Sequence, residues 1–364
     1  MIELRIRAGP APYPFRAGPG LLESLGSSLR ELGLVGKVAV ISDADAFSRW
    51  GVPALRSLGE ADLPWINVEV PPGERSKTLA HAGELYGKLI EHGVGRGDTV
   101  VALGGGMVGD LAGFVAATYH RGLSFVQVPT TLLAQVDSSV GGKVAVDHPL
   151  GKNLVGAFHH PRLVLADTRT LATLPARQRW SGLAEVAKAA LIADPSFLEF
   201  LEQHLDALSG DEAPDALLSE AIARAVRIKA GIVEADERET SLRRVLNFGH
   251  TIGHALEAAT GYVALTHGEA VVKGMKAALV VSWQLGRLGQ TEAERALALL
   301  ARFPAPPPFV PPPRDAVIAA ARRDKKAEGA ELRYVILTAL GRTEVLPHLP
   351  TPLLEAAVDV ALET

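Results

Sequence analysis

Short apolar runs in the first half of the chain constrain its fold most strongly. They occupy Lys37–Ser42, Thr99–Leu103, Phe125–Pro129 and Leu163–Ala166. Helical stretches, such as residues 79–92 and 110–118, lie between them. Uninterrupted apolar runs of this length are typical of parallel strands buried on both faces, and their alternation with helices indicates βαβ units. We therefore expect residues 1–174 to form an α/β domain with a mostly parallel sheet.

From about Leu174 onward the apolar residues repeat with helical spacing. The predicted helices are Leu183–Ile192, Ser196–Leu208, Ala216–Glu234, Gly249–Ala259, Gly268–Leu285 and Glu292–Arg302. A proline-rich segment follows at Pro304–Pro313, and a hairpin at Arg333–Val345 precedes a last helix. We therefore expect residues 175–364 to form a mainly helical domain. A cleft between two such domains is the default place for a site.

Composition excludes several classes of protein. The formal net charge of −4 argues against a nucleic-acid partner, which requires a basic face. No apolar run approaches the roughly 18 residues that span a bilayer, and the N-terminus is unlike a signal peptide. We therefore expect a cytoplasmic protein without a membrane partner. The chain has no cysteine, so a transition metal would have to bind histidines and carboxylates.

A glycine motif follows one of the predicted strands. Residues 104–109 read GGGMVG, which matches G-x-G-x-x-G and opens a helix. Glycines at such a turn let backbone N–H groups approach a pyrophosphate, so the motif favours a Rossmann-like NAD site. The usual acidic residue about 20 positions later is missing, and Asp43 could bind the ribose instead. The alternative is a tight strand–helix turn that needs glycine for packing alone.

Small polar residues gather after another predicted strand. Residues 129–143 read PTTLLAQVDSSVGGK, and GKN at 151–153 repeats the pattern of glycine beside lysine. Such segments form concave nests of backbone N–H groups that bind anions. The loop PPGERSK at 71–77 could belong to the same site or be an ordinary solvated loop. Together these segments indicate a small substrate with several negative charges.

The second half holds a candidate metal site. Residues 246–269 contain His250, His254 and His267, and the first two share a helix face because they are four residues apart. Glu185 lies in another predicted helix, with Lys188 one turn later. Three nitrogen and oxygen ligands are what a catalytic zinc ion with an open position requires. The alternative is that the histidines are ordinary surface or core residues.

Taken together, these segments resemble the 3-dehydroquinate synthase family. The resemblance rests on PPGERSK, GGGMVGD, PTTLLAQVDSSVGGK, GKN, LAEVAKAALI and LRRVLNFGHTIGHALE, which occur in order between residues 43 and 326. It implies an NAD- and zinc-dependent homodimer, with cobalt also possible, that acts in the shikimate pathway. Such enzymes convert the sugar phosphate 3-deoxy-D-arabino-heptulosonate 7-phosphate (DAHP) into 3-dehydroquinate and phosphate. The steps are transient oxidation at C5, phosphate elimination, re-reduction, ring opening and aldol closure.

The resemblance also implies a role for each matching residue. The metal ligands would be Glu185, His250 and His267. The substrate would contact Arg121, Asp137, Lys143, Asn153, Lys188, Lys229, Glu239, Arg243, Asn247, His254 and one of Lys325 and Lys326. Within that set Lys143, Asn153 and Arg121 would bind phosphate, with Arg121 supplied by the partner subunit. Lys229 and Arg243 would bind the carboxylate, and His254 with Asn247 would serve the proton relay and phosphate region.

NAD would contact residues from several loops of the first domain. They are Asp43, Gly73, Glu74, Lys77, Gly104, Gly105, Gly106, Gly109, Asp110, Thr130, Thr131, Lys143, Lys152 and Thr173.

Three other functions remain open at this point. Another sugar-phosphate cyclase would act on a substrate that has no carboxylate, and therefore would not need both Lys229 and Arg243. A glycerol-dehydrogenase-like oxidoreductase would catalyse net redox chemistry and would not need two anion-binding sets. A structural or regulatory protein of the same fold would not need an intact ligand triad.

Overall fold

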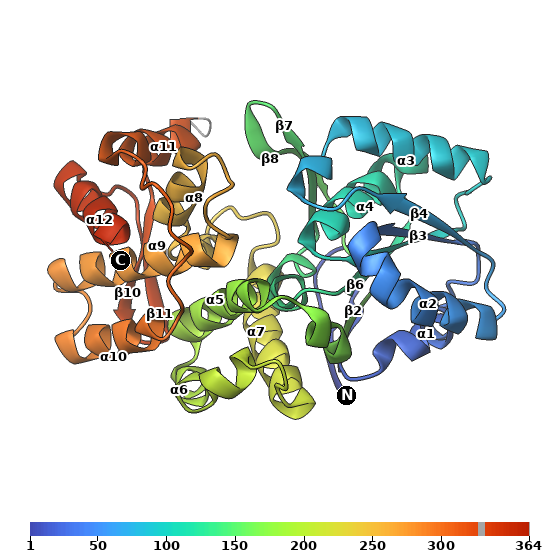
Figure 1. Cartoon of the computed structure of the whole chain (residues 1–364), viewed down its shortest axis with the longest axis horizontal. Helices are drawn as coiled ribbons and strands as arrows, with labels where there is room; N and C mark the ends of the chain where they lie inside the picture. Colours follow the sequence, from blue (N-terminus) through green and yellow to red (C-terminus); the bar gives the residue numbers. More distant parts are fainter. Residues whose placement is uncertain (327–331, 364) are drawn as a thin grey trace. The chain divides into compact units, whose positions relative to one another are not determined.

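The computed structural model describes residues 1–326 and 332–363, apart from the side chains of residues 324–326. The chain forms two compact units (Figure 1). The first comprises Met1–Leu174 and Asp211–Glu237, and the second comprises Pro175–Gly210 and Arg238–Thr364. The expected division between residues 174 and 175 is therefore one boundary. Residues 211–237 differ from the expectation, because they belong to the first unit and not to the helical one.

A seven-stranded sheet organises the described residues of the first unit, in the order β1-β2-β9-β6-β5-β3-β4. Its strands are β1 (Ile2–Ile6), β2 (Tyr13–Gly18), β3 (Val38–Asp43), β4 (Trp65–Val70), β5 (Thr99–Gly104), β6 (Ser124–Pro129) and β9 (Leu163–Asp167). All neighbouring pairs are parallel except β1 with β2. The four apolar runs are thus β3, β5, β6 and β9, which confirms the predicted parallel sheet.

Helices cover both faces of this sheet. They are α1 (Leu25–Glu31), α2 (Ala44–Glu60), α3 (Leu79–Glu91), α4 (Gly106–Thr118) and α7 (Asp215–Ala235). Because side chains alternate along a strand, Val38 and Val40 pack with the α1 and α2 residues, whereas Ala39 and Ile41 pack with those of α3 and α4. Two apolar cores therefore fix the carboxyl ends of β3, β5 and β6 at one edge.

A hairpin that the sequence did not predict completes the first unit. Strands β7 (Lys143–His148) and β8 (Gly151–Phe158) pair antiparallel, and residues 139–142 connect them to a π-helical turn, η4 (Ala134–Ser138). The 3-10 turns of this unit are η1 (Leu21–Ser24), η2 (Glu74–Ser76), η3 (Tyr119–Arg121) and η5 (Thr168–Thr173). The predicted polar nest is therefore a turn leading into β7, and GKN begins β8.

The second unit is mainly helical, as expected, and carries a small hairpin. Its elements are α5 (Ala176–Ala193), α6 (Pro195–Ser209), η6 (Leu242–Asn247), α8 (His250–Ala259), α9 (His267–Gln284), α10 (Gln290–Ala301), α11 (Arg314–Lys326), β10 (Tyr334–Ala339), β11 (Arg342–Leu346) and α12 (Thr351–Glu363). None of the described helices is long and apolar enough to cross a membrane.

Glycines bring α8 and α9 unusually close together. A Cβ atom on Gly274 would lie 1.9 Å from the carbonyl oxygen of Gly249, and one on Gly253 would lie 3.0 Å from that of Ala270. Gly249 also has φ +79°, which favours glycine at the residue before α8. The glycines of the GHTIGH motif therefore serve packing, and they set His250 beside the first turn of α9.

Candidate active site

Glu185, His250 and His267 form a compact cluster within the second unit. Glu185 lies on α5, while His250 and His267 are the first residues of α8 and α9. Glu185 Oε1 is 3.6 Å from His250 Nε2 and 3.2 Å from His267 Nε2. The three candidate ligand atoms lie within 4.8 Å of one another. The structure thus brings together the three residues that the resemblance implied as metal ligands.

Hydrogen bonds orient both imidazole rings. His250 Nδ1 lies 3.1 Å from the carbonyl oxygen of Phe248, and His267 Nδ1 lies 3.4 Å from Glu257 Oε2. When each Nδ1 carries the proton and donates to its oxygen partner, each Nε2 lone pair faces the cluster. Metal-binding histidines are usually held in this way by a carbonyl or carboxylate.

The electrostatics of the cluster suit a cation. Burial lowers the pKa of His250 well below its usual value, and Lys188 lowers it further, so this ring is neutral. Burial raises the pKa of Glu185, but Lys188 and the two histidines outweigh that effect and hold it well below the usual range. For His267, hydrogen bonds to Glu185 and Glu257 outweigh burial and raise the pKa to about 10. Without a metal, a proton on His267 therefore supplies the positive charge that the two carboxylates require.

His254 lies beside this cluster on α8, with its ring centroid 5.1 Å from that of His250 and 5.9 Å from that of His267. Its side chain is exposed, unlike Glu185. Ligand atoms of His254, Glu257 and His267 also lie within 4.8 Å of one another, so they form a second possible group that shares His267.

Three other predicted residues of the second unit lie on α5 and η6. Lys188 forms a buried ion pair with Glu185 one turn away on α5, and their spacing predicted only that the two side chains lie on the same side of the helix. Arg243 is buried within η6. Asn247, the last residue of η6, donates a 3.0 Å hydrogen bond from Nδ2 to Glu239 Oε1.

Lys77 is the centre of a charged cluster in the first unit. Its buried ammonium group lies 2.9 Å from Glu74 Oε1 and 3.2 Å from Asp110 Oδ2, and it donates a 2.7 Å hydrogen bond to Asn153 Oδ1. Lys152 Nζ is 3.3 Å from the same Glu74 oxygen. Burial raises the pKa of Asp110 to about 6, although Lys77 opposes the shift. The structure thus joins residues predicted to bind NAD with Asn153, which was predicted to bind phosphate.

The glycine motif forms the turn from β5 into α4. A Cβ atom on Gly104 would lie 2.7 Å from Val108 Cβ, and one on Gly109 would lie 2.7 Å from Gln127 Oε1. Packing alone therefore requires Gly104, as the tight-turn alternative proposed, whereas the end of the Gln127 side chain could move away from a Cβ at position 109. No side-chain hydrogen bond caps the N-terminus of α4, whose first-turn N–H groups are the kind of donors that bind a pyrophosphate.

Other predicted NAD contacts lie at the carboxyl ends of the neighbouring strands. Asp43 ends β3 and caps α2 by accepting from Ala46 N at 2.9 Å, while burial raises its pKa. Thr130 N donates to Gly104 O at 2.9 Å, and Thr131 follows in the same turn. Gly73 precedes η2 with φ +94°, and Thr173 ends η5.

Asp137 and Lys229, two of the predicted substrate contacts, form an ion pair in the first unit. Lys229, on α7, donates 2.7 Å hydrogen bonds to both the carbonyl oxygen and Oδ1 of Asp137 in η4. This pair is one of several contacts that join α7 to the α/β unit, and others are made with β1 and β2. Lys143 begins β7 and is exposed.

Arg121 lies in a strained turn between α4 and β6. His120 and Arg121 have φ of +51° and +70°, in the left-handed region that non-glycine residues rarely adopt. Arg121 is exposed and precedes β6, whereas Thr130 follows it, so the two lie at opposite ends of this strand. The side chains of Lys325 and Lys326 lie outside the described part of the structure.

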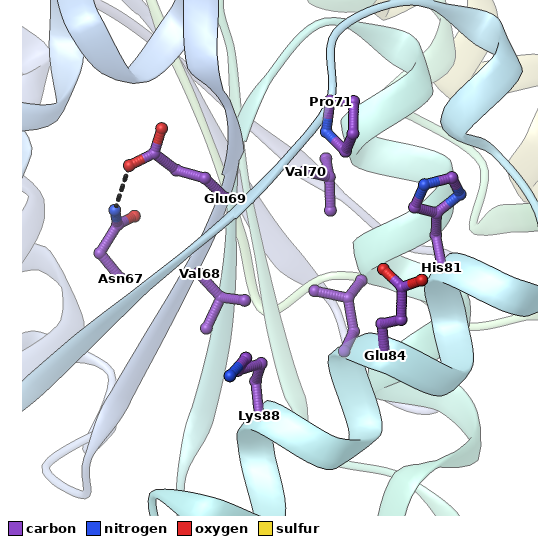
Figure 2. Close-up of a pocket in the computed structure, with 9 residues that line it drawn as sticks. Asn67, Val68, Glu69, Val70, Pro71, His81, Glu84 and Lys88 are labelled. Atoms are coloured by element: carbon purple, nitrogen blue, oxygen red, sulfur yellow. Dashed lines mark hydrogen bonds between the residues drawn. The ribbon is translucent and has the colours of Figure 1, made fainter.

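A small hollow of about 210 Å³ lies between β4 and α3 (Figure 2). Asn67, Glu69, His81, Glu84 and Lys88 contribute its polar groups, and Asn67 Nδ2 donates to Glu69 Oε1 at 3.1 Å. None of the predicted site residues lines it.

Two residues at these clusters escaped the sequence interpretation. Glu257 contacts His267, and its position three residues after His254 on one helix was the signal available. Asp147 accepts a 2.9 Å hydrogen bond from Asn153 N, where Asn153 has φ +58°, and its Oδ1 is 3.8 Å from Lys77 Nζ. Asp147 could not be found from sequence because its pairing depends on the unpredicted β7–β8 hairpin.

The first unit is a parallel α/β fold with a glycine turn, and the second is helical with a partly buried Glu–His–His cluster. Together they define a class of candidate metal-dependent enzymes with a Rossmann-like domain. Residues 67–181 match the family profile described as 3-dehydroquinate synthase N-terminal, and residues 182–327 match 3-dehydroquinate synthase C-terminal. The chain belongs to the 3-dehydroquinate synthase family.

Individual relatives agree with this assignment. The 3-dehydroquinate synthase of Pelotomaculum thermopropionicum is 49% identical over 347 residues, covering 95% of this chain and 93% of that protein. A crystal structure of 2-deoxy-scyllo-inosose synthase, complexed with carbaglucose-6-phosphate, NAD⁺ and Co²⁺, is 28% identical with a TM-score of 0.89 and covers 100% of both chains. The 2-epi-5-epi-valiolone synthase of Streptomyces hygroscopicus, with NAD⁺ and Zn²⁺ bound, is 28% identical with a TM-score of 0.88, covering 98% of both chains.

Proposed function

We propose that this chain catalyses the 3-dehydroquinate synthase reaction of the shikimate pathway, in which DAHP is converted to 3-dehydroquinate and phosphate. The cluster of Glu185, His250 and His267 carries the proposal, because its three ligand atoms could hold a divalent metal of the kind bound in the related cyclase structures. The proposal includes a cytoplasmic location, which suits a metabolic enzyme of this family. It also includes a homodimer, because we assign Arg121 to the site of the partner subunit.

The triad fits Zn²⁺ or Co²⁺ by its donor chemistry. Two imidazole nitrogens and one carboxylate oxygen leave a coordination position for substrate, as in catalytic zinc sites. A metal ion held by Glu185, His250 and His267 would act as a Lewis acid that lowers the pKa of a substrate hydroxyl. Lys188 balances the charge of Glu185, and Phe248 and Glu257 orient the two rings.

The first unit offers a fitting site for NAD. The glycine turn permits close approach of a pyrophosphate to α4, and Asp43 lies on the neighbouring strand end, where it could bind a ribose hydroxyl. NAD⁺ held by these residues would supply reversible hydride chemistry. Glu74, Lys77, Asp110, Lys152, Thr130, Thr131 and Thr173 complete the proposed NAD set.

The doubly anionic substrate requires two sets of donors. We assign its phosphate to Lys143, Asn153 and Arg121, and its carboxylate to Lys229 and Arg243, because charge-assisted hydrogen bonds are the strong ones in such sites. Lys77 and Asp147 hold Asn153 in its left-handed conformation, and Asp137 holds the Lys229 ammonium group in place.

The remaining polar residues would handle protons. We place His254, which is exposed beside His250, in the proton relay together with Asn247. Glu239 orients the Asn247 amide by accepting its Nδ2–H. Lys188 would complete the polar network around the substrate ring.

The test measures phosphate release from DAHP with catalytic NAD⁺ and Zn²⁺. We expect turnover that requires both and leaves no accumulated NADH. Steady growth of NADH absorbance in step with product would indicate a simple dehydrogenase. Turnover of a sugar phosphate without a carboxylate, but not of DAHP, would indicate another cyclase.

Subunit mixing tests the homodimer and the role of Arg121. An Arg121→Ala chain and a Lys143→Ala chain should each be inactive alone, whereas mixed dimers should regain one working site. Mixing Arg121→Ala with itself after the same dissociation treatment is the control. No recovery in mixed dimers would show that Arg121 does not act across an interface.

A further inference from the structure

A larger cavity lies in the second unit and reaches Gly268, which follows His267 in the chain. Its volume is about 580 Å³, which falls in the range of small-molecule pockets. The start of α5, one side of α9 and the segment after α10 form its walls. Among the proposed metal ligands and substrate contacts, none lines it.

The walls of this cavity combine an apolar surface with positive charge. The rings of Trp180 and Phe303 meet edge to face, with their centroids 5.0 Å apart, and Pro304, Pro306 and Pro307 extend the apolar wall.

The charged residues of the lining are mostly basic. Arg177, Lys273 and Lys276 carry positive charge, whereas Glu269 is the one acidic residue among the lining residues that the structure describes. An apolar body with a few placed charges is the usual composition of a ligand site.

Internal pairing removes one of the three cations. Arg177 donates 2.7 Å hydrogen bonds to both carboxylate oxygens of Glu269. Two lysines therefore provide the net charge of the cavity. Lys273 is buried and donates a 3.3 Å hydrogen bond to the carbonyl oxygen of Ala361, and Lys276 is half-buried. Burial lowers the pKa of each lysine, and their mutual repulsion lowers that of Lys273 further.

The cavity and the metal cluster use different sides of α9. At about 100° per residue, Val272, Lys273 and Lys276 lie roughly opposite His267 on the helix. Glu269 links the two sides, because it also completes the capping box with Thr266 that begins α9 at His267.

We propose that this cavity binds a small organic anion with an apolar, aromatic body. Trp180, Phe303 and the prolines contact the body, and the Lys273 and Lys276 ammonium groups bind its carboxylate or other anionic group. The site is independent of the proposed reaction, because it uses none of the residues assigned to it.

Calorimetric titration of the zinc-loaded full chain tests the proposal, with 3-phenylpropionate as the probe and its neutral amide as the matched ligand. We expect saturable binding of the carboxylate at one site and at least about ten-fold weaker binding of the amide, since a hydrogen bond to a charged group is lost. Lys276→Met should weaken carboxylate binding by a similar factor. Lys88→Met makes the same change in the hollow of Figure 2 and should leave binding unchanged.

Tryptophan fluorescence locates the bound probe. Quenching on titration should disappear in Trp180→Phe, while calorimetry still detects binding by that variant. Equal binding of carboxylate and amide, or unchanged binding by Lys276→Met, would overturn the anion assignment. Absence of saturable binding, or binding that falls as the protein self-associates, would show that the cavity is not a ligand site.

Discussion

The metal cluster of the second unit and the Lys77 cluster of the first both bury charge, but they balance it differently. Around Lys77, the ammonium group already contacts Glu74, Asp110 and Asn153, so the charges are paired within the protein. Around Glu185, two imidazole Nε2 atoms approach one carboxylate oxygen, and a proton on His267 substitutes for a cation. The first cluster is balanced by its own lysine, whereas the second is balanced by a proton on His267 that a bound metal ion would replace.

The largest effect should come from removing a ligand of the second cluster. His250→Ala should lose bound zinc and about 100-fold or more of activity while remaining folded, because even indirect partners of metal ligands contribute 10–100-fold. His254→Ala is the matched variant on the same helix, and it should keep its zinc while losing turnover. Zinc content per chain and phosphate release check both. A full equivalent of zinc in His250→Ala would falsify the ligand assignment.

Removing the central cation of the first cluster should act mainly on stability. Lys77→Met leaves carboxylates partly buried without their partner, which should lower the free energy of unfolding by about 3 kcal/mol. Lys88→Met removes an exposed lysine paired with Glu91 and should cost under about 1 kcal/mol. Urea unfolding of the two variants provides the comparison. Equal losses would mean that Lys77 does not organise its cluster.

A smaller effect should follow from removing the partner of His267. Glu257→Ala should weaken zinc binding by about 10–100-fold, because the carboxylate no longer holds Nδ1–H and the ring can turn. Glu257→Gln keeps an acceptor and should lie between the wild type and Glu257→Ala. Competition with a chelator measures the affinity, and Glu220→Ala, an exposed change on α7, is the control. Two equivalents of wild-type zinc, falling to one in Glu257→Ala, would instead assign Glu257 to a second metal site.

The last effect concerns pH and is confined to the metal-free protein. In the metal-free protein the pKa of His267 is raised to about 10 from an ordinary 6.5, so the folded state favours the protonated ring. That contribution to stability is fully present below pH 6.5 and is lost as the pH rises toward 10. Unfolding free energies of chelator-treated protein should therefore fall over this range. The decline should flatten in His267→Gln and in zinc-loaded protein, where the metal replaces the proton. A slope unchanged by His267→Gln would assign the dependence to another group.

Local patterns in the sequence determined much of this protein. The apolar runs predicted β3, β5, β6 and β9 because strands buried on both faces need uninterrupted apolar residues. Helical spacing predicted the helices of the second half for a similar reason, and the linear motifs identified the family. The period of the apolar residues and the residue types at turns depend on neighbours in the sequence, so they can be recognised without a structure.

Tertiary structure alone decided which residues meet. The spacing of His250 and His254 places both on one helix face and does not show which of them is a metal ligand. Close packing of α8 on α9 through Gly253 and Gly274 sets His250 beside Glu185 and leaves His254 exposed. Helix α7 joined the α/β unit, and Asp147 and Glu257 entered the clusters, through contacts between residues far apart in the chain or on different elements. Such contacts depend on the backbone positions of both partners, and no local period encodes them.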